Sequence, residues 1–489
     1  MLDIINSISS FISDNILIVV LLAAAIYFTY VTRGVQFRLF GEMIRLLLKS
    51  GKSDNDARSR ETDGHHTISS FQAFMVSIAS RVGTGNLAGV ATAIALGGPG
   101  AVFWMWIIAL LGAASAFIES TLAQLYKIRG EKSFVGGPAY YISKGLRNRA
   151  WAICFAILIT LTFGLAFNSV QANTIAEAFG NTFSVPPLAT AITLSILTLI
   201  IIWGGIQSIA RFSEIIVPVM AIAYLTLAIV IVALHINELP AVLKLIISNA
   251  FGFDQAMGGT FGMAVIMGTK RGLFSNEAGE GSAPNVAATA SVSHPVKQGL
   301  IQSLGVLTDT LLVCSCTAFI ILISGAYLGN ADGIVLTQTA VDMGLGHEGI
   351  GSLFVSIAIF FFAFSSIVAN YYYGETNLRF IRKSYPLIAI YRVLVAGMVF
   401  VGSIATLDFV WSFADITMAL MTLCNLAAIV LLGKYAVKCL NDYCSQRRLG
   451  LDPVYTSGII PEIAEDTPCW NPIEDENADS DMQTNANKS

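Results

Sequence analysis

Two glycine-rich stretches interrupt apolar runs and leave backbone groups free to bind a ligand. They read SRVGTGNLAG (residues 80–89) and MGTKRGLFSNEAGEG (residues 267–281). Glycine costs about 1 kcal/mol relative to alanine in a helix interior, so we expect the helix to unwind in each stretch. A break leaves free C=O groups where the first half-helix ends and free N–H groups where the second begins. The N–H groups suit an anion, and the C=O groups suit a hard cation.

The first stretch offers both kinds of group within a few residues. The amides of Thr84, Gly85 and Asn86 open its second half-helix and are predicted to hold a carboxylate, with the Thr84 hydroxyl as a further donor. The carbonyls of Ala79 and Val82 end its first half-helix and are predicted to bind Na⁺. An amino acid together with sodium fits this arrangement. The alternative is that the glycines only allow helices to pack closely, and two matched breaks disfavour it.

The composition places both stretches in a membrane. The 489 residues are 55% hydrophobic and only 12% charged, and the mean hydropathy is +0.69. A soluble domain of this length carries about 25% charged residues. A membrane span needs roughly 18 apolar residues. Eleven segments reach or approach this length, at about 15–32, 68–97, 101–126, 150–178, 187–204, 210–235, 256–287, 298–325, 349–374, 386–406 and 408–433.

The basic residues fall in alternate loops between these segments. This alternation predicts an N-terminus outside the cell and a C-terminus in the cytoplasm. Residues 1–66 would form an extra N-terminal transmembrane helix and a basic amphipathic helix on the cytoplasmic face, and 67–433 a ten-helix core. The core divides into halves at about 68–235 and 256–433. Each half has five spans and a break in its first helix, which is typical of an inverted repeat. Residues 434–489 would be a polar cytoplasmic tail, partly disordered.

Several longer stretches are distinctive. They include SRVGTGN, VQANTIAEAFG, GTKRGLFSNEAGEGSAP, HPVKQGL and FFAFSSIVANYYYGE. From about Ile68 to Gly433 the chain strongly resembles the alanine or glycine:cation symporter family. The resemblance implies an all-α membrane protein with a LeuT-type 5+5 inverted repeat and one extra N-terminal helix, eleven transmembrane helices in all. It also implies Na⁺-coupled import of alanine, glycine or a near relative, with Na⁺ as the coupling ion and no organic cofactor.

The resemblance also implies particular site residues. The substrate site would comprise Thr84, Gly85, Gln171, Gly268 and Thr269, and the sodium site Ala79, Val82, Phe362, Ser365 and Ser366. Gly268 and Thr269 would lie at the second break and offer backbone to the amine. The sodium site would contain only oxygen ligands, as a hard cation requires. The chain departs from the family pattern twice, with Ser-Ser at 365–366 where Ser-Thr is more usual, and with Glu280 where an apolar residue is expected.

Ionisable side chains within spans are candidates for a further role. Arg81, Glu119, Asp309 and Asp415 qualify, and Arg81, Asp309 and Glu119 could form a gate or a proton relay. The alternative is that these groups are structural ions paired within the protein.

Three classes of function fit such a protein. A membrane-embedded enzyme is disfavoured, because none of the five histidines falls at mid-span and neither H-E-x-x-H nor GxSxG occurs. A channel or a receptor for a small solute could share the fold without ion coupling. Only flux measurements would distinguish it from a symporter. Among symporters, proton coupling and a serine or glutamine substrate remain alternatives.

The predicted partners follow from these classes. They are a small amino acid and the lipid bilayer, with no obligate protein partner and no metal beyond sodium. The net charge of −4 argues against nucleic acid. The predicted location is the inner membrane of a bacterial or archaeal cell.

Overall fold

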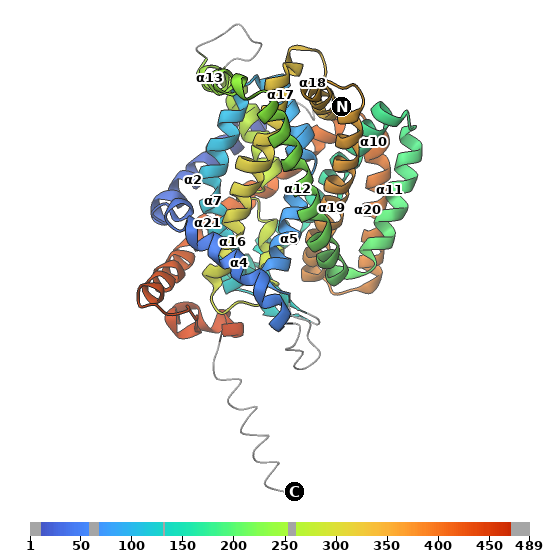
Figure 1. Cartoon of the computed structure of the whole chain (residues 1–489). Helices are drawn as coiled ribbons and strands as arrows, with labels where there is room; N and C mark the ends of the chain where they lie inside the picture. Colours follow the sequence, from blue (N-terminus) through green and yellow to red (C-terminus); the bar gives the residue numbers. More distant parts are fainter. Residues whose placement is uncertain (1–10, 58–67, 131–132, 253–260, 471–489) are drawn as a thin grey trace, which may run out of the picture.

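The computed structural model describes residues 11–57, 68–130, 133–252 and 261–470, which are mostly helical (Figure 1). The long helices stand side by side in one bundle, with shorter helices at its two ends. The expected N-terminal segment, second half and tail extend in part beyond these ranges, at 1–10, 58–66, 256–260 and 471–489, and those parts lie outside the described residues.

The bundle contains two runs of helices that each begin with a broken helix. The first run comprises α5 (Ser70–Arg81), η2 (Gly85–Gly89), α6 (Val90–Gly97), α7 (Ala101–Leu125), α9 (Arg149–Leu161), η3 (Thr162–Phe167), α10 (Asn168–Phe183), α11 (Pro187–Ile202) and α12 (Gly205–Leu234). The second run comprises α14 (Phe261–Asn276), α15 (Ala283–Ala287), α16 (Pro295–Leu307), η5 (Thr308–Cys314), α17 (Ser315–Ser324), α19 (Ile350–Ile381), α20 (Tyr385–Ile404) and α21 (Leu407–Arg448). The two broken helices contact each other, since α14 packs against both η2 and α6.

Shorter elements precede, connect and follow these runs. They are η1 (Phe11–Leu17), α2 (Ile18–Val31), α3 (Val35–Arg38), α4 (Phe40–Ala57), β1 (Ile128–Arg129), β2 (Phe134–Val135), α8 (Pro138–Gly145), η4 (Ile236–Glu238), α13 (Leu239–Ala250), η6 (Ala326–Leu328), α18 (Gly333–Leu345), η7 (Ser457–Ile459), η8 (Pro461–Asp466) and η9 (Pro468–Trp470). Strands β1 and β2 pair antiparallel, with Ile128 opposite Val135. The expected amphipathic helix is α4, which packs against α16.

Eight of the described helices are long and apolar enough to cross a membrane. The other expected spans are the broken helices α5–α6 and α14–α15 and the 16-residue helix α11. On α11 the exposed large side chains recur every four residues, at Leu188, Ile192, Ile196 and Ile200. Such a stripe of apolar side chains on one helix face suits contact with lipid.

The C-terminal segment, expected to be a polar and partly disordered tail, is folded over much of its length. Helix α21 continues without a break from Leu407 to Arg448, past the expected end of the core at 433. The chain then folds back over the helix ends, where Tyr455 N donates to Ser293 O at 2.8 Å and Trp470 Nε1 donates to Gln124 O at 3.2 Å. Both aromatic side chains are buried. Residues 434–470 of the expected tail are therefore folded onto the core.

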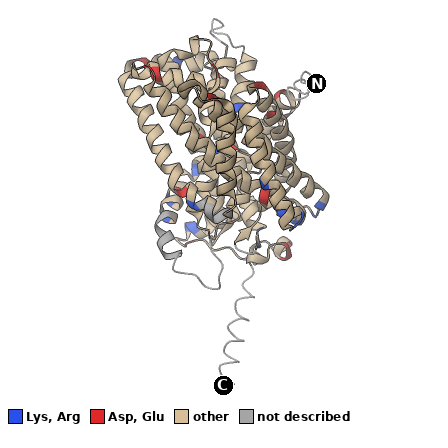
Figure 2. Cartoon of the chain, turned by 90° about the vertical axis from the view of Figure 1, so that its right-hand side faces the viewer, with Lys and Arg blue, Asp and Glu red and all other residues tan. Residues whose placement is uncertain are grey.

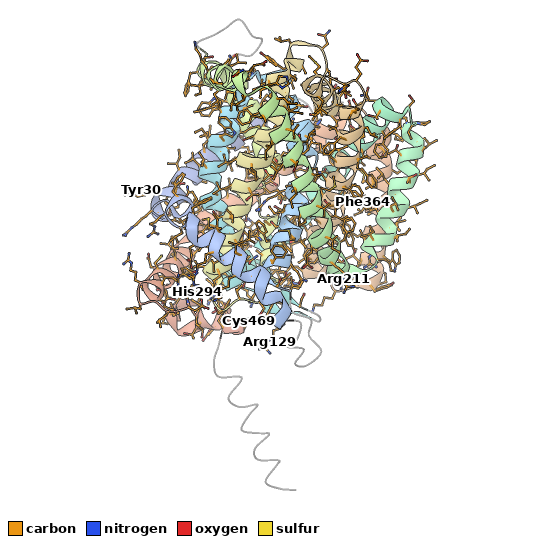
Figure 3. The ribbon with its side chains drawn as sticks, in the orientation of Figure 1. Tyr30, Arg129, Arg211, His294, Phe364 and Cys469 are labelled. Carbon is orange, nitrogen blue, oxygen red and sulfur yellow. The ribbon has the colours of Figure 1, made fainter. Side chains whose placement is uncertain are left out.

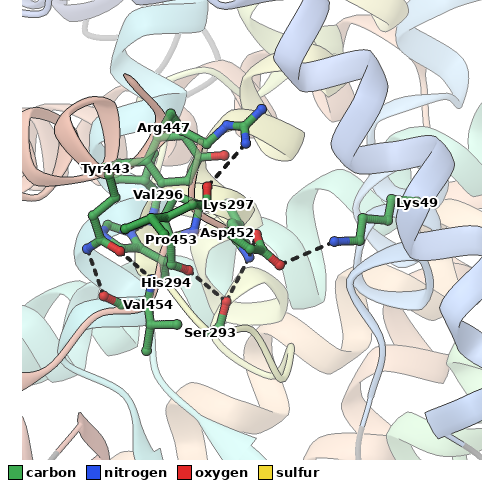
Figure 4. A network of polar contacts seen from close by, with 12 residues as sticks. Lys49, Ser293, His294, Val296, Lys297, Tyr443, Arg447, Asp452, Pro453 and Val454 are labelled. Carbon is green, nitrogen blue, oxygen red and sulfur yellow. Dashed lines mark hydrogen bonds and ion pairs between the residues drawn. The ribbon is translucent and has the colours of Figure 1, made fainter. Parts of the chain in front are cut away.

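One aspartate of this segment joins two distant helices. Asp452 lies between Lys297, at 2.6 Å, and Lys49 on α4, at 3.2 Å (Figure 4). Burial would raise the pKa of Asp452, but the hydrogen bonds and charges of Lys297 and Lys49 outweigh that effect and hold its pKa below the usual range. The carboxylate therefore keeps its charge at neutral pH and ties the C-terminal segment to α4 and α16.

Candidate functional site

The first break lies where the glycine-rich sequence predicts it. Helix α5 ends at Arg81, Val82 has extended backbone angles (φ −80°, ψ 92°), and helical structure resumes at Gly85. In a continuous helix Gly83 N–H would donate to Ala79 C=O, four residues back. It donates instead to the side-chain oxygen of Asn86, at 2.9 Å. The capping by Asn86 thus leaves the Ala79 carbonyl free for another partner.

The five oxygens expected to bind sodium converge beside this break. Ser366 Oγ on α19 lies 2.8 Å from Ala79 O, 3.5 Å from Val82 O and 3.0 Å from Phe362 O. Ser365 Oγ lies 2.8 Å from the same Phe362 carbonyl. All five residues are buried. Neutral carbonyl and hydroxyl oxygens are hard donors of the kind that an alkali cation takes.

The residues expected to hold the carboxylate also meet at this break. Thr84 N–H donates to Gln171 Oε1 on α10 at 2.9 Å, so the side chain reaches the half-helix N-terminus. The Thr84 hydroxyl is buried and has no hydrogen-bond partner. A Cβ on Gly83 would lie 2.8 Å from Gln171 Oε1 and 2.4 Å from Ser366 Oγ. Gly83 therefore lies between the oxygens of the two expected sites. Only a glycine has no Cβ that would clash with the Gln171 and Ser366 side chains.

Three aromatic rings that the sequence reasoning missed border the same break. The ring centroids of Phe167 and Phe274 are 4.4 Å apart, and those of Phe274 and Trp411 are 4.7 Å apart. A Cβ on Gly89 would lie 3.9 Å from Trp411, whose buried Nε1 has no hydrogen-bond partner. One available signal was the position of Phe167, one helical turn before Gln171.

Gly268 and Thr269 do not lie at the second break. Helix α14 runs through both residues to Asn276, and the chain leaves helical geometry at Glu277 (φ 56°), Gly279 (φ 86°) and Gly281 (φ 84°). A Cβ on Gly268 would lie 2.4 Å from Ala101 O, so this glycine serves the close packing of α14 on α7. Their expected position at the break is therefore wrong, and their contact with the substrate amine stays a prediction.

Long-range ion pairs explain why α14 continues past its basic residues. Lys270 Nζ lies 3.0 Å from both Asp14 and Asp415, and Arg271 binds both oxygens of Asp415 at 3.2 and 3.1 Å. Arg271 also stacks on Trp411, with its guanidinium 3.9 Å from the ring centroid. These partners neutralise the charges that would otherwise oppose a buried helix. Asp415 is thus an internally paired ion.

Ser275 of α14, like its neighbour Phe274, approaches the first break. A Cβ on Gly85 would lie 2.9 Å from Ser275 Cα, so the two broken helices touch at this point. Asp309 on η5 links them, because its carboxylate accepts from Asn86 Nδ2 at 2.6 Å and from Ser275 Oγ at 2.8 Å. Thr310 Oγ1 adds a third donor at 3.0 Å. Asp309 therefore connects the first break to helix α14.

Glu119 occupies the second break itself. Its carboxylate accepts from the backbone N–H groups of Gly279, at 3.2 Å, and Gly281, at 3.0 Å. Asn425 Nδ2 adds a donor at 2.9 Å and also donates to Gly279 O. The amides that this break exposes are thus bound by a carboxylate of the protein itself.

Arg81 ends the first half-helix and is buried. Its Nη1 lies 3.4 Å from the backbone and side-chain oxygens of Gln302, while Nε and Nη2 have no hydrogen-bond partner. The structure therefore gives Arg81, Asp309 and Glu119 separate hydrogen-bond partners. Among the described residues, no group of three or more His, Cys, Asp or Glu side chains could hold a metal ion.

Comparison with known proteins gives relatives over nearly the whole chain. The model of the sodium:alanine symporter family matches residues 1–457. The probable sodium/glutamine symporter GlnT of Bacillus subtilis is 49% identical over 468 residues, covering 96% of this chain and 95% of GlnT. The amino-acid carrier protein AlsT of the same organism is 50% identical, over 94% of this chain and 96% of AlsT. The sodium/alanine symporter AgcS of Methanococcus maripaludis is 36% identical, over 89% of this chain and 95% of AgcS.

A solved structure shares the fold. The LeuT-fold transporter MhsT, solved in complex with L-phenylalanine, superposes with a TM-score of 0.52 at 15% identity, covering 77% of this chain and 96% of MhsT. Its likeness shows the fold alone. The family model and the relatives agree over nearly the whole length of the chain. This chain is a multi-pass membrane transporter, not an enzyme, and belongs to the sodium:alanine symporter family.

Proposed function

We propose that this protein is a sodium-coupled symporter that imports a small neutral amino acid by alternating access. The observation that carries the proposal is the convergence of Ala79 O, Val82 O, Phe362 O and the two serine hydroxyls beside the Thr84 amide. A cation at the hydroxyl pair would stabilise the carbonyl end of α5, and a carboxylate would bind at the N-terminus of η2. Each ligand would order the same break, so the binding of one would favour the binding of the other.

The carboxylate would bind the amides of Thr84 and Gly85 and the free hydroxyl of Thr84. Gln171 would have to release the Thr84 amide, because a single N–H cannot serve both acceptors well. Its side-chain amide could then donate to the carboxylate from the side. This exchange of acceptors would make the position of Gln171 depend on the substrate.

The substrate would be alanine or glycine. The rings of Phe167, Phe274 and Trp411 pack on one another beside the break and limit the room for a side chain. A methyl group fits such a wall better than the longer, polar side chain of glutamine. Serine and glutamine are the alternatives, and the similarity to GlnT, a probable sodium/glutamine symporter, supports glutamine.

We further propose an inverted repeat of residues 68–235 and 256–433 within eleven spans, with the N-terminus outside and the C-terminus in the cytoplasm. Most Lys and Arg residues lie toward the lower end of the bundle in Figure 2. Arg129 in β1 and Arg211 near the start of α12 both lie toward that end (Figure 3). This distribution supports the proposed orientation in a cell membrane, where basic loops face the cytoplasm.

The experiment is uptake into proteoliposomes that contain the purified protein. Radiolabelled alanine, glycine, serine and glutamine are supplied under an inward Na⁺ gradient, with an equal K⁺ gradient as the control. We expect concentrative uptake of alanine or glycine with Na⁺ only. Alaninamide, which lacks the carboxylate, should not compete. Uptake that stops once the inside and outside substrate concentrations are equal would indicate a channel. Uptake driven by a proton gradient without Na⁺ would mean that the coupling ion is the proton and not sodium.

A further inference from the structure

Glu280 is a buried carboxyl group that the proposed transport mechanism does not use. It lies in the second break, at a position where the family pattern implies an apolar residue, and its exposed fraction is 0%. Neither of its carboxyl oxygens has a hydrogen-bond partner. An ionised carboxylate buried without a hydrogen bond or a counter-ion is strongly unfavourable, and such a group normally takes up a proton.

The three neighbouring carboxyl groups, unlike Glu280, accept hydrogen bonds. Glu119 accepts from two backbone amides and from Asn425. Glu277 accepts from Ser80 and Ser282, both at 2.5 Å, and Asp309 accepts from three side chains. Hydrogen bonds from several donors stabilise a carboxylate in its charged form. Glu280 alone among these four lacks them.

The charges around Glu280 also favour its neutral form. The charged groups that act on it are Glu277 in the same break, Glu119 from α7 and Arg81 from α5. Asp309 from η5 interacts electrostatically with Glu277 and Arg81, and so does Tyr373 from α19. Arg81 is thus the one cation among these groups, and it faces four carboxyl groups. A negative charge on Glu280 would be repelled by two neighbours and would share this single counter-charge.

We propose that Glu280 is a proton-binding site of this transporter, and that it is neutral in the conformation described here. Glu280 stands between Gly279 and Gly281, the two residues whose amides hold the Glu119 carboxylate. Loss of its proton to water would place a second negative charge beside that carboxylate and would weaken the closed geometry of the break. Return of the proton would restore it. The inference rests on the proposed sodium-coupled transport, whose rate would then depend on pH.

The test measures Na⁺-driven uptake by the full chain in proteoliposomes between about pH 5.5 and pH 8.5, a range in which a perturbed carboxyl group can titrate. For the natural protein we expect uptake to fall toward alkaline pH. Above the pH at which half of the Glu280 side chains have lost their proton, the uptake rate should decrease by about tenfold per pH unit, as for loss of one proton. Glu280→Gln is permanently neutral and should keep Na⁺-driven uptake that varies by no more than about twofold across the range.

Glu177→Gln is the matched control. Glu177 lies on α10 near Asp332, and its Oε2 also lacks a hydrogen-bond partner, but it lies outside the second break. This variant should retain the pH profile of the natural protein. If Glu280→Gln does not insert into the membrane, Glu280→Met replaces it, because an apolar side chain of similar length also removes the titration.

Two results would overturn the inference. One is a pH profile that Glu280→Gln or Glu280→Met leaves unchanged, and the other is a natural protein whose uptake does not vary with pH. Either result leaves sodium coupling intact. Absence of Na⁺-driven uptake at every pH would instead overturn the proposed function.

Discussion

The two broken helices of this protein satisfy their exposed backbone groups in opposite ways. At the first break, the free carbonyls meet the hydroxyl of Ser366, and the free Thr84 amide meets the neutral side chain of Gln171. At the second break, the free amides of Gly279 and Gly281 are bound by the carboxylate of Glu119. Both breaks arise from glycine-rich sequence, yet only at the second does a carboxylate of the protein bind the exposed amides.

The difference indicates a division of roles. A charged ligand gains most where it replaces a neutral partner, because hydrogen bonds to charged groups are the stronger ones. At the second break the Glu119 carboxylate already provides that charge, and displacing it would leave a buried charge without partners. The first break therefore suits the substrate and sodium, while the second suits a structural or pH-sensitive role.

Filling the first break should have the largest effect. In Gly83→Ala the new methyl group would lie 2.4 Å from Ser366 Oγ and 2.8 Å from Gln171 Oε1. The clash is relieved only if both side chains turn away from the break, so both ligand sites are lost. We expect initial uptake to fall by about a hundredfold, from an overpacking cost of roughly 3 kcal/mol.

Gly89→Ala is the control for this substitution. Its new methyl group would lie 3.7 Å from Thr84 O and 3.9 Å from Trp411, which is ordinary contact. Uptake by this variant should stay near that of the natural protein, and gel filtration should show both variants folded. Normal uptake by a folded Gly83→Ala protein would reassign the first break to helix packing.

Removing single hydroxyl groups should give a smaller effect that differs between two adjacent serines. Ser366 Oγ lies near two carbonyls of the first break, whereas Ser365 Oγ contacts Phe362 on its own helix. Ser366→Ala should raise the Na⁺ concentration for half-maximal uptake about tenfold, the lower end expected for one contact to a charged group. Ser365→Ala should raise it less. An unchanged Na⁺ dependence in the Ser365→Ala, Ser366→Ala double variant would remove this cation site.

The geometry of the first break could be predicted from the sequence because its determinants are local or match a known pattern. Gly83 and Asn86 lie within three residues of each other, and the hydroxyl pair at 365–366 follows the family motif. The expected meeting of Thr84 with Gln171, and of Ala79 and Val82 with Ser366, corresponds to contacts in the structure. That these residues bind substrate and sodium stays a prediction.

The second break could not be located in the same way, because its position depends on contacts between distant residues. Glycine and charge at 268–271 suggest a break, but Asp14 and Asp415 neutralise Lys270 and Arg271, and α7 packs closely on Gly268. The capping carboxylate comes from a residue 160 positions earlier in the chain. No local pattern encodes such a pairing. The folded C-terminal segment was missed for the same reason, since its partners, Gln124 on α7 and Lys297 on α16 among them, lie far away along the chain.

The smallest effect on transport should come from the charge that holds the second break. Glu119→Gln keeps the size of the side chain but directs an N–H₂ group at one of the two glycine amides. One backbone hydrogen bond is lost and a buried donor is left unsatisfied, so the free energy of unfolding should fall by about 1–3 kcal/mol. The half-maximal concentrations of Na⁺ and substrate should change by no more than about twofold, because the first break is intact. Thermal unfolding in detergent and saturation curves for uptake measure the two quantities on the same preparation. Glu177→Gln, which removes a carboxylate without touching either break, should alter neither of them. A tenfold or larger change in substrate affinity in Glu119→Gln, with normal stability, would place ligand binding at the second break and reverse the division of roles between the two.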